Sequence, residues 1–422
     1  MSAPPRIAIV GAGAAGSMAA IFASEGDAET LLLERTSDGG RKILISGGGR
    51  CNVLPMRAAP ERFVTDSPPR LVSRLLRSWA LPEQVRFFEE TLGVRLAAEP
   101  ETGKLFPASG RARDVRDALY AAVRRRGVRM RHDTLVTGLE PGPRGWRIAC
   151  EGAPPLEAEA VVIATGGLSI PRSGSDGRLL PLLSALGHAI HETYPALTPL
   201  TAPTSSPYAG LAGVSLPVAI SARAGELRAN ASGGFLFTHR GYSGPAVLDV
   251  SHVAVRSRGD GGEPARLRVR WTPLGEAEWT ERLRPRGIRT VSGALRAELP
   301  ERLAAALARE AGVDAATPLS RLRRDDRIRL LETLVAGEIP WSGHEGYAKA
   351  EVTGGGIALD EIDPKTMESR RAPGLFLCGE ILDAFGPIGG HNFQWAWATG
   401  RAAGLGAAAR VSAPAGCSPG PR

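Results

Sequence analysis

The feature that most constrains this fold is a group of three glycines near the start of the chain. Gly11, Gly13 and Gly16 form the pattern G-x-G-x-x-G directly after a short apolar run, residues 6–10, and at the start of an apolar helical stretch. In this pattern the first glycine allows a tight turn, the second lets a pyrophosphate approach the backbone, and the third lets the helix pack against the strand. The sequence therefore predicts a strand, a turn and a helix whose N-terminal N–H groups bind a dinucleotide.

An acidic residue at a suitable distance strengthens this prediction. Residues 28–34 are predicted to form a second buried strand that ends at Glu34, 18 residues after Gly16. A carboxylate at that strand end can accept hydrogen bonds from both hydroxyls of an adenosine ribose. The alternative, a helix start that is merely rich in alanine and glycine, leaves Glu34 unexplained.

Two later glycine-rich strand ends indicate which dinucleotide binds. The run "AVVI" leads into "ATGG" (164–167), and a late strand "LFLCGE" ends at Gly379 and Glu380, 346 residues after Glu34. A nicotinamide dehydrogenase needs only the first fingerprint, whereas a long cofactor extended across a sheet also reaches distant strand ends. FAD fits that length, although either segment taken singly is also compatible with an ordinary glycine turn.

Two further glycine-rich segments are candidate flavin contacts. The loop 38–52 is predicted to lack regular structure, and its "SGGG" (46–49) has no side chain to block a flat ring. "GPIGGHNFQWAWATG" is predicted to be a loop that enters a helix, whose N–H groups would stabilise the charge of a reduced flavin. There His391 is a candidate proton donor, with a structural loop histidine as an equal alternative. Trp395 and Trp397 are predicted to be core residues.

Changes in composition along the chain predict a discontinuous architecture. We expect an α/β domain at residues 1–190 with 346–410, and a β-rich module inserted into it at 191–275 with 338–345. A helical insert within that module is expected at 276–337, and a disordered tail at 411–422. The inserted module contains His239 and Tyr242, which are candidates for contact with a substrate. Cys417 lies in the expected tail and is predicted to have no role.

Charge and cysteine usage exclude several classes of protein. The net charge is +8, but the cations are dispersed along the chain, which favours a compositional bias over a nucleic-acid surface. The four cysteines are too sparse for a disulfide scaffold or a zinc site, so no metal and a reducing cytoplasm are expected. Residues 7–24 carry no charge, yet the glycine fingerprint explains them better than a signal peptide or a membrane span. Cys51 and Cys378, near cofactor loops, are predicted to be buried packing residues.

Four stretches of the sequence resemble one known family. "GRKILISGGGRCN", "GGFLFTHRGYSGPAVLDVS", "EVTGGGIALDEIDPKTMESR" and "GLFLCGEILDAFGPIGGHNFQWAWATGRAAG" are similar to the BaiN-like (YhiN-like) NAD(P)/FAD-dependent oxidoreductases, also called aminoacetone oxidase family flavoproteins. The resemblance covers residues 6–408. It implies an α/β fold with a FAD-binding Rossmann-like domain of the glutathione-reductase type, interrupted by a β-barrel-like domain that carries a helical insert.

The resemblance also implies roles for single residues. It places Ala15 and Gly16 at the pyrophosphate, Glu34 at the adenosine ribose, Lys42 and Asn52 along the cofactor, the Val136 backbone at the adenine, Glu380 at the ribityl side and Phe393 by the flavin. The family usually has Gly-Gly-Tyr-Asn where this chain has His391 before Asn392, and this departure is expected to alter what touches the flavin or substrate. The full set of expected cofactor-binding residues is Gly11, Gly13, Ala14, Ala15, Gly16, Glu34, Arg41, Lys42, Ser46, Gly47, Asn52, Val136, Gly166, Gly379, Glu380, Asn392 and Phe393.

The expected function is that of a flavin oxidoreductase. Hydride would pass from NAD(P)H through flavin N5 to an organic acceptor, such as an activated C=C bond, with His391 or His239 as the catalytic candidate. Residues 190–345 contain no second G-x-G-x-x-G, so NAD(P)H is expected to bind transiently. A small-molecule substrate and no nucleic-acid partner are expected. The alternatives are a flavin-dependent RNA-modifying enzyme, an oxygen-using hydroxylase and a flavin-binding protein without activity.

Overall fold

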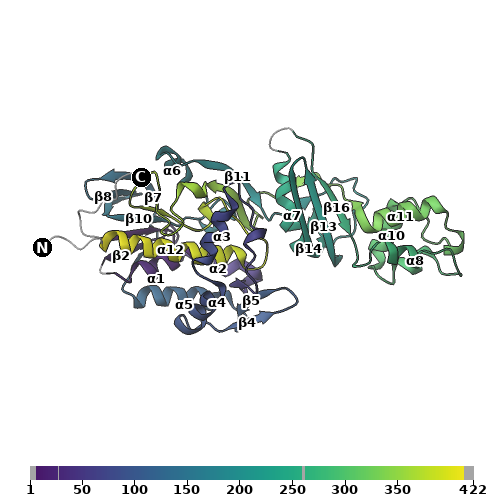
Figure 1. Cartoon of the computed structure of the whole chain (residues 1–422), viewed down its shortest axis with the longest axis horizontal. Helices are drawn as coiled ribbons and strands as arrows, with labels where there is room; N and C mark the ends of the chain where they lie inside the picture. Colours follow the sequence, from purple (N-terminus) through teal and green to yellow (C-terminus); the bar gives the residue numbers. More distant parts are fainter. Residues whose placement is uncertain (1–5, 27, 259–261, 413–422) are drawn as a thin grey trace. The chain divides into compact units, whose positions relative to one another are not determined.

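The computed structural model describes residues 6–26, 28–258 and 262–412, and the chain divides into two compact units (Figure 1). The first unit combines the chain up to Thr193 with the chain from Val352, and the second spans Tyr194–Glu351. The two boundaries lie three and six residues beyond those expected from the sequence. The second unit is thus an insertion into the first.

A five-stranded parallel sheet forms the centre of the first unit. Its order is β20-β10-β1-β2-β6, and its strands are β1 (Arg6–Val10), β2 (Glu29–Leu33), β6 (Arg129–Arg131), β10 (Ala160–Ile163) and β20 (Leu375–Leu377). Strands β10 and β20 are buried along their whole length, as expected for parallel strands with both faces covered. The predicted α/β fold with a Rossmann-like sheet is confirmed.

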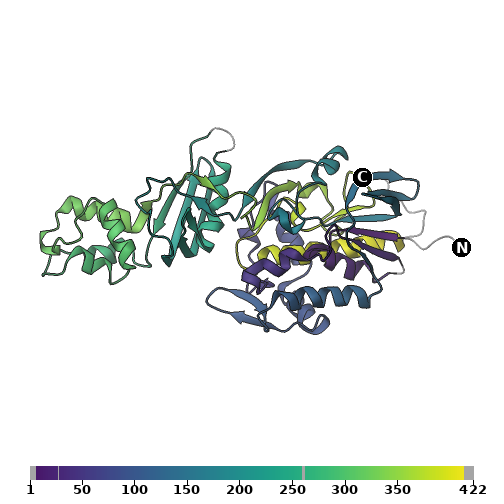
Figure 2. The ribbon, with the colours of Figure 1, turned by 180° about the vertical axis from the view of Figure 1, so that it is seen from behind.

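Helices α1 (Ala14–Ala23) and α12 (His391–Ser412) lie side by side in both views (Figures 1 and 2). Glycines allow this close approach, because a Cβ atom on Gly400 would lie 2.4 Å from the carbonyl oxygen of Ala15, and one on Gly404 would lie 2.4 Å from that of Ala19. Within the described chain no helix, α12 included, has both the length and the apolar character needed to cross a membrane.

Smaller elements complete the first unit. The helices are α2 (Arg41–Ile45), α3 (Pro69–Arg77), α4 (Leu81–Arg86), α5 (Ala112–Arg125) and α6 (Leu180–Ala185). Two antiparallel sheets accompany them, one formed by β3 (Leu54–Pro55), β5 (Lys104–Pro107) and β4 (Leu96–Glu99), the other by β7 (Val136–Gly142), β8 (Gly145–Cys150) and β9 (Ala153–Ala158). A further two-stranded sheet pairs β11 (Ile190–Ala196) with β19 (Val352–Ile357).

The second unit is built on a seven-stranded sheet. Its order is β17 (Gly337–Glu338), β16 (Arg266–Arg270), β13 (Ser215–Ala224), β14 (Leu227–Phe237), β15 (Gly241–Ser243), β12 (Leu200–Thr201) and β18 (Gly343–His344). Helix α7 (Pro245–Arg256) packs on one face of β13 and β14, and α8 (Glu276–Arg282), α9 (Val291–Leu295), α10 (Glu301–Glu310) and α11 (Arg324–Ala336) follow. Among the described residues the edge strands β17 and β18 do not pair with each other, so the expected barrel-like domain is an open sheet.

Four local predictions differ from the structure. The loop 38–52 contains helix α2, because the apolar run "KILI" follows a chain reversal at Gly39 and Gly40, whose φ angles are 57° and 61°. Helix α7 lies in the module that was expected to be β-rich, because its valine-rich sequence favours strands. Packing against the sheet overrides this local preference. Residues 70–130 carry helical patterns that alternate with short turns and are predicted to be mainly helical, but the hairpin of β4 and β5 interrupts them. Helix α12 continues to Ser412, into the expected tail, whereas Cys417 lies outside the described residues.

Candidate cofactor site

The glycine-rich strand ends meet at one edge of the parallel sheet. Gly11 follows β1, Ala164 follows β10 and Gly379 follows β20, and parallel strands present their carboxyl ends at the same edge. A Cβ atom on Gly11 would lie 2.6 Å from the carbonyl oxygen of Ala164, and one on Gly379 would lie 2.8 Å from the Cβ of Ala15. The fold therefore brings three segments that are distant in sequence into contact at this edge.

The glycine fingerprint leaves room where the expected pyrophosphate needs it. A Cβ atom on Gly16 would lie 1.8 Å from the carbonyl oxygen of Gly11, so Gly16 is required for packing. A Cβ atom on Gly13 would meet no protein atom within 4 Å. Gly13 is also the N-cap of α1, and no side chain caps this helix, so its first N–H groups can bind an anion. These features fit the phosphates of a dinucleotide.

Glu34 connects the end of β2 to the fingerprint. Its Oε2 accepts a hydrogen bond from the Ala12 N–H at 2.9 Å, and its Oε1 accepts from the N–H and Oγ1 of Thr36 at 2.8 and 2.6 Å. The residue is 8% exposed. A carboxylate oxygen has two lone pairs, so both oxygens retain capacity to accept from ribose hydroxyls. Its place beside the fingerprint fits the predicted ribose contact, which stays a prediction.

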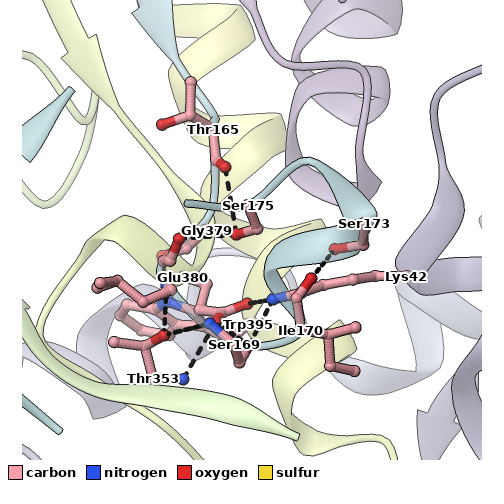
Figure 3. Close-up of polar contacts among 12 residues, drawn as sticks. Lys42, Thr165, Ser169, Ile170, Ser173, Ser175, Thr353, Gly379, Glu380 and Trp395 are labelled. Carbon is pink, nitrogen blue, oxygen red and sulfur yellow. Dashed lines mark hydrogen bonds and ion pairs between the residues drawn. The ribbon is translucent and has the colours of Figure 1, made fainter. Parts of the chain in front are cut away.

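A cluster of four polar side chains, Lys42, Ser169, Thr353 and Glu380, lies at the same edge (Figure 3). Lys42 Nζ donates to Glu380 Oε2 at 2.6 Å and to Ser169 Oγ at 2.5 Å. Ser169 Oγ donates to Glu380 Oε1 at 2.6 Å, and the N–H and Oγ1 of Thr353 each donate to the same oxygen at 3.0 Å. One carboxylate therefore holds together α2, the loop after β10, β19 and the turn after β20.

Sequence reasoning identified Lys42 and Glu380 but missed Ser169 and Thr353. A Cβ atom on Gly167 would lie 2.3 Å from Thr353 Oγ1, so the second glycine of "ATGG" is what admits the threonine. The sequence does show that both hydroxyl residues lie beside glycine-rich segments, which is the signal that could have identified them. That Ser169 contacts Thr353, 184 residues further along the chain, follows only from the fold.

The loop residues divide into two groups. Asn52 Oδ1 is buried and has no hydrogen-bond partner in the described chain, and a Cβ atom on Gly47 would lie 3.1 Å from it. A buried amide oxygen without a donor is the kind of group that a bound ligand can satisfy. By contrast, Arg41 pairs with Asp38 at 2.6 Å near the surface, and Ser46 Oγ donates to the carbonyl of Ile43. The structure does not bring Arg41 into the polar cluster.

The start of α12 is rigidly held. Asn392 Oδ1 accepts from the Gly386 N–H and its Nδ2 donates to the Gly386 carbonyl, both at 2.9 Å. The ring of Phe393 stacks on that of Trp397 with centroids 5.3 Å apart. Trp395 and Trp397 are 1% and 0% exposed, which confirms that both belong to the core. Asn392 thus shapes the glycine loop through backbone contacts.

His391 is buried beside Phe63, and its Nδ1 has no partner among the described residues. Burial, reinforced by the positive charge of Arg62, lowers the pKa of His391 to about 4. The ring is therefore neutral at pH 7, and any proton that it donates comes from a neutral imidazole. Its catalytic role stays a prediction with this restriction.

The lowered pKa of His391 predicts a pH-dependent stability. The pKa of His391 in the folded chain lies below the usual 6.5, so below pH 6.5 the unfolded chain binds a proton that the folded chain does not. The contribution of neutral His391 to the free energy of unfolding is therefore complete above pH 6.5 and is lost as the pH falls towards 4. Between these limits wild type should lose about 3 kcal/mol more of its free energy of unfolding than His391→Gln. His252, also buried with a lowered pKa, is present in both proteins and cancels. Equal pH dependence in denaturant titrations would contradict the burial of a neutral imidazole.

The remaining predicted residues have structural settings. Val136 is buried in β7. Cys51 and Cys378 are fully buried, as predicted, and burial raises the pKa of Cys51 to about 12. In the second unit Tyr242 is 1% exposed and donates to the carbonyl of Pro340, so it is a core residue and not a substrate contact. His239 is exposed, and its catalytic role stays a prediction.

Known proteins are similar to this chain in sequence or in fold. The chain is 33% identical over 401 residues to a ribosomal RNA dihydrouridine synthase of Escherichia coli strain K12, covering 93% of this chain and 95% of that protein. It is 33% identical over 417 residues to a 3-dehydro-bile acid delta(4,6)-reductase of Clostridium scindens, covering 96% and 99%. The crystal structure of a 3-ketosteroid-delta4-(5alpha)-dehydrogenase from Rhodococcus jostii RHA1 shares the fold, with a TM-score of 0.51, 17% identity and coverage of 95% and 96%.

A family model covers nearly the whole described chain. The model for the HI0933-like protein Rossmann domain matches residues 5–406. This match, together with the relatives above, confirms the resemblance indicated by the sequence motifs. The chain is an oxidoreductase with a flavin-type Rossmann fold, and it belongs to the family of HI0933-like proteins.

Proposed function

We propose that this chain binds FAD and reduces a C=C bond conjugated with a carbonyl group, with NAD(P)H as a transient hydride donor. The observation that carries the proposal is the meeting of the fingerprint, Glu34 and the turn at Gly379 and Glu380 at one edge of the parallel sheet. Free space beside Gly13, where an added Cβ atom would meet no protein atom within 4 Å, supports the binding of a pyrophosphate at that edge.

The residues of the chain have distinct tasks in this proposal. The uncapped N–H groups of α1 bind the phosphates, and Glu34 binds the adenosine ribose. Lys42 holds the Glu380 carboxylate in one orientation. In that orientation the carboxylate accepts hydrogen bonds from the ribityl hydroxyl groups. FAD, when bound, supplies hydride transfer at N5, so the chain needs to contribute positioning and electrostatics.

The names of the two relatives suggest the substrate class. Dihydrouridine carries two hydrogens more than uridine, across a C=C bond conjugated with a carbonyl. A delta(4,6)-reductase of a 3-dehydro bile acid likewise acts on double bonds conjugated with a carbonyl at position 3. Both names describe the same bond chemistry on unlike molecules, and we extend that chemistry to this chain.

A single-turnover experiment tests this reaction. The FAD-loaded protein is photoreduced without oxygen and mixed in separate trials with a 4-en-3-one steroid and with a uridine-containing RNA. We expect one of them to reoxidise the flavin and to yield a product with two added hydrogens by mass spectrometry. The saturated 3-keto steroid and an RNA that already contains dihydrouridine are the matched controls. A flavin that stays reduced with both acceptors contradicts the proposed substrate class.

A further inference from the structure

Three neighbouring strands of the second unit present arginines on one face. In β16 the residues alternate between exposed and buried, so Arg266, Arg268 and Arg270 all lie on the face opposite α7. Arg223 of β13 and Arg228 of β14 are exposed on the same face. The arginines are dispersed along the sequence, but the folded sheet brings five of them together on one face.

Three of these arginines form a row across the sheet, which we call the arginine row: Arg266, Arg223 and Arg228. Arg223 is directly opposite Arg266 on one side and Arg228 on the other. None of the three forms an ion pair within the described chain. Like charges directly opposite each other in a sheet destabilise it, so the row is costly for folding unless an anion neutralises it.

The surroundings of the row indicate which anion fits. The neighbouring outward positions are Ser221, Asn230 and Ser232, which carry hydrogen-bonding groups and no negative charge. Among the described residues, the acidic side chains nearest to this part of the face are Glu226 in the turn, Glu263 three residues before Arg266, and Glu338, which lies 3.9 Å from Arg268. Guanidinium groups match phosphates in geometry as well as charge.

The face also lacks the groups that a membrane or an unpaired base requires. No large apolar side chain is exposed at the arginine end of the face, so there is nothing to insert into a bilayer. No aromatic side chain stands on the outward positions of β13, β14 and β16, so bases cannot stack on it. An array of arginines without these groups suits the backbone of a double-stranded RNA, which proteins read mainly through phosphates and 2′-hydroxyls.

We propose that the arginine row is a docking surface for the backbone of a structured RNA. This inference rests on the proposed function only for the reaction that follows docking. The Escherichia coli relative, which is named for an RNA substrate, is compatible with it. Contact is independent of base sequence and sensitive to salt, because each arginine displaces counterions from the RNA.

The test compares two triple variants with the same change of charge. One replaces the row by Arg223→Gln, Arg228→Gln and Arg266→Gln, and the control replaces three exposed arginines of the same unit by Arg321→Gln, Arg323→Gln and Arg324→Gln. The probe is a fluorescently labelled RNA duplex of about 20 base pairs. Its dissociation constant is measured by anisotropy across a range of salt concentrations with the full chain.

The row variant should bind the duplex about tenfold more weakly or worse, and its salt slope should fall by about 3, one for each arginine. The control should stay within about twofold of wild type. The row variant should melt at the same temperature as wild type or higher, because like-charge repulsion is relieved. If the triple variant does not fold, Arg223→Gln alone should lower the slope by about 1.

Three results would overturn the docking surface. They are equal losses in row and control variants, unchanged binding in the row variant, and binding of phosphatidylserine vesicles, rather than RNA, that depends on the row. Flavin content and flavin reduction are measured on the same proteins. A chain without flavin whose RNA binding depends on the row contradicts the proposed function alone, whereas a normal flavin with unchanged RNA binding contradicts the docking surface alone.

Discussion

Replacing Gly13 by valine is expected to abolish flavin binding while the chain remains folded. A Cβ atom at this position meets no protein atom within 4 Å, and the backbone of Gly13 is in an extended conformation that any residue adopts. The added atoms therefore occupy only the space that the pyrophosphate needs. We expect affinity for FAD to fall about 100-fold or more, equivalent to about 2.7 kcal/mol. The free energy of unfolding of the flavin-free protein should fall by no more than about 1 kcal/mol.

Two other glycines make this result specific. Gly142→Val places the same side chain in β7, where the Cβ atom makes ordinary contacts, the nearest at 3.7 Å, and should retain both fold and flavin. Gly16→Val forces a carbon into the carbonyl of Gly11 and should prevent folding of the first unit. Isothermal titration of flavin-free protein with FAD measures the affinities. Stoichiometric flavin in Gly13→Val would contradict the assigned phosphate site.

Removing the carboxylate of Glu380 is expected to destabilise the first unit more than any surface change. Four donor groups converge on it, and its side chain is only 19% exposed. Glu380→Ala leaves Lys42 without its counterion and the Thr353 N–H without an acceptor. We expect a loss of about 2 kcal/mol, between the values for an exposed pair and a fully buried one, because the Lys42–Glu380 pair is partly buried and several donors lose their acceptor. Thermal unfolding of flavin-free proteins measures this loss without interference from the cofactor.

A surface pair and a double variant are the controls for Glu380. Glu281 pairs with two arginines where its side chain is 46% exposed, so Glu281→Ala should cost less than about 1 kcal/mol. Combining Lys42→Met with Glu380→Ala removes both charges and should be less destabilised than Glu380→Ala alone. Equal losses for Glu281→Ala and Glu380→Ala would show that the polar cluster does not hold the four segments together.

Local sequence patterns predict the parts of this fold in which one segment determines its own structure. The fingerprint and the apolar strand before it predict β1, α1 and the turn between them, and the strand ends at Ala164 and Gly379 predict where the sheet edge lies. The resemblance to known flavoproteins adds the contacts of Lys42 and Glu380 with the cofactor, which remain predictions.

Features that depend on contacts between distant segments could not be predicted. Ser169 and Thr353 join the polar cluster only because packing brings two loops together across the sheet. The arginine row depends on the register of three strands, and no count of arginines along the chain can reveal it. The lowered pKa of His391 likewise depends on burial under neighbouring segments, although imidazole in general titrates near neutrality.

The most direct measurement is an anaerobic absorbance titration of the purified chain, followed at the flavin band near 450 nm. We expect a yellow protein with about one FAD per chain, as one fingerprint holds one dinucleotide. NADH or NADPH should bleach this band, with Gly13→Val as the colourless control. A protein that is colourless and cannot be reconstituted with FAD would contradict the assignment of the site, and a yellow protein that neither nucleotide reduces would contradict the proposed donor.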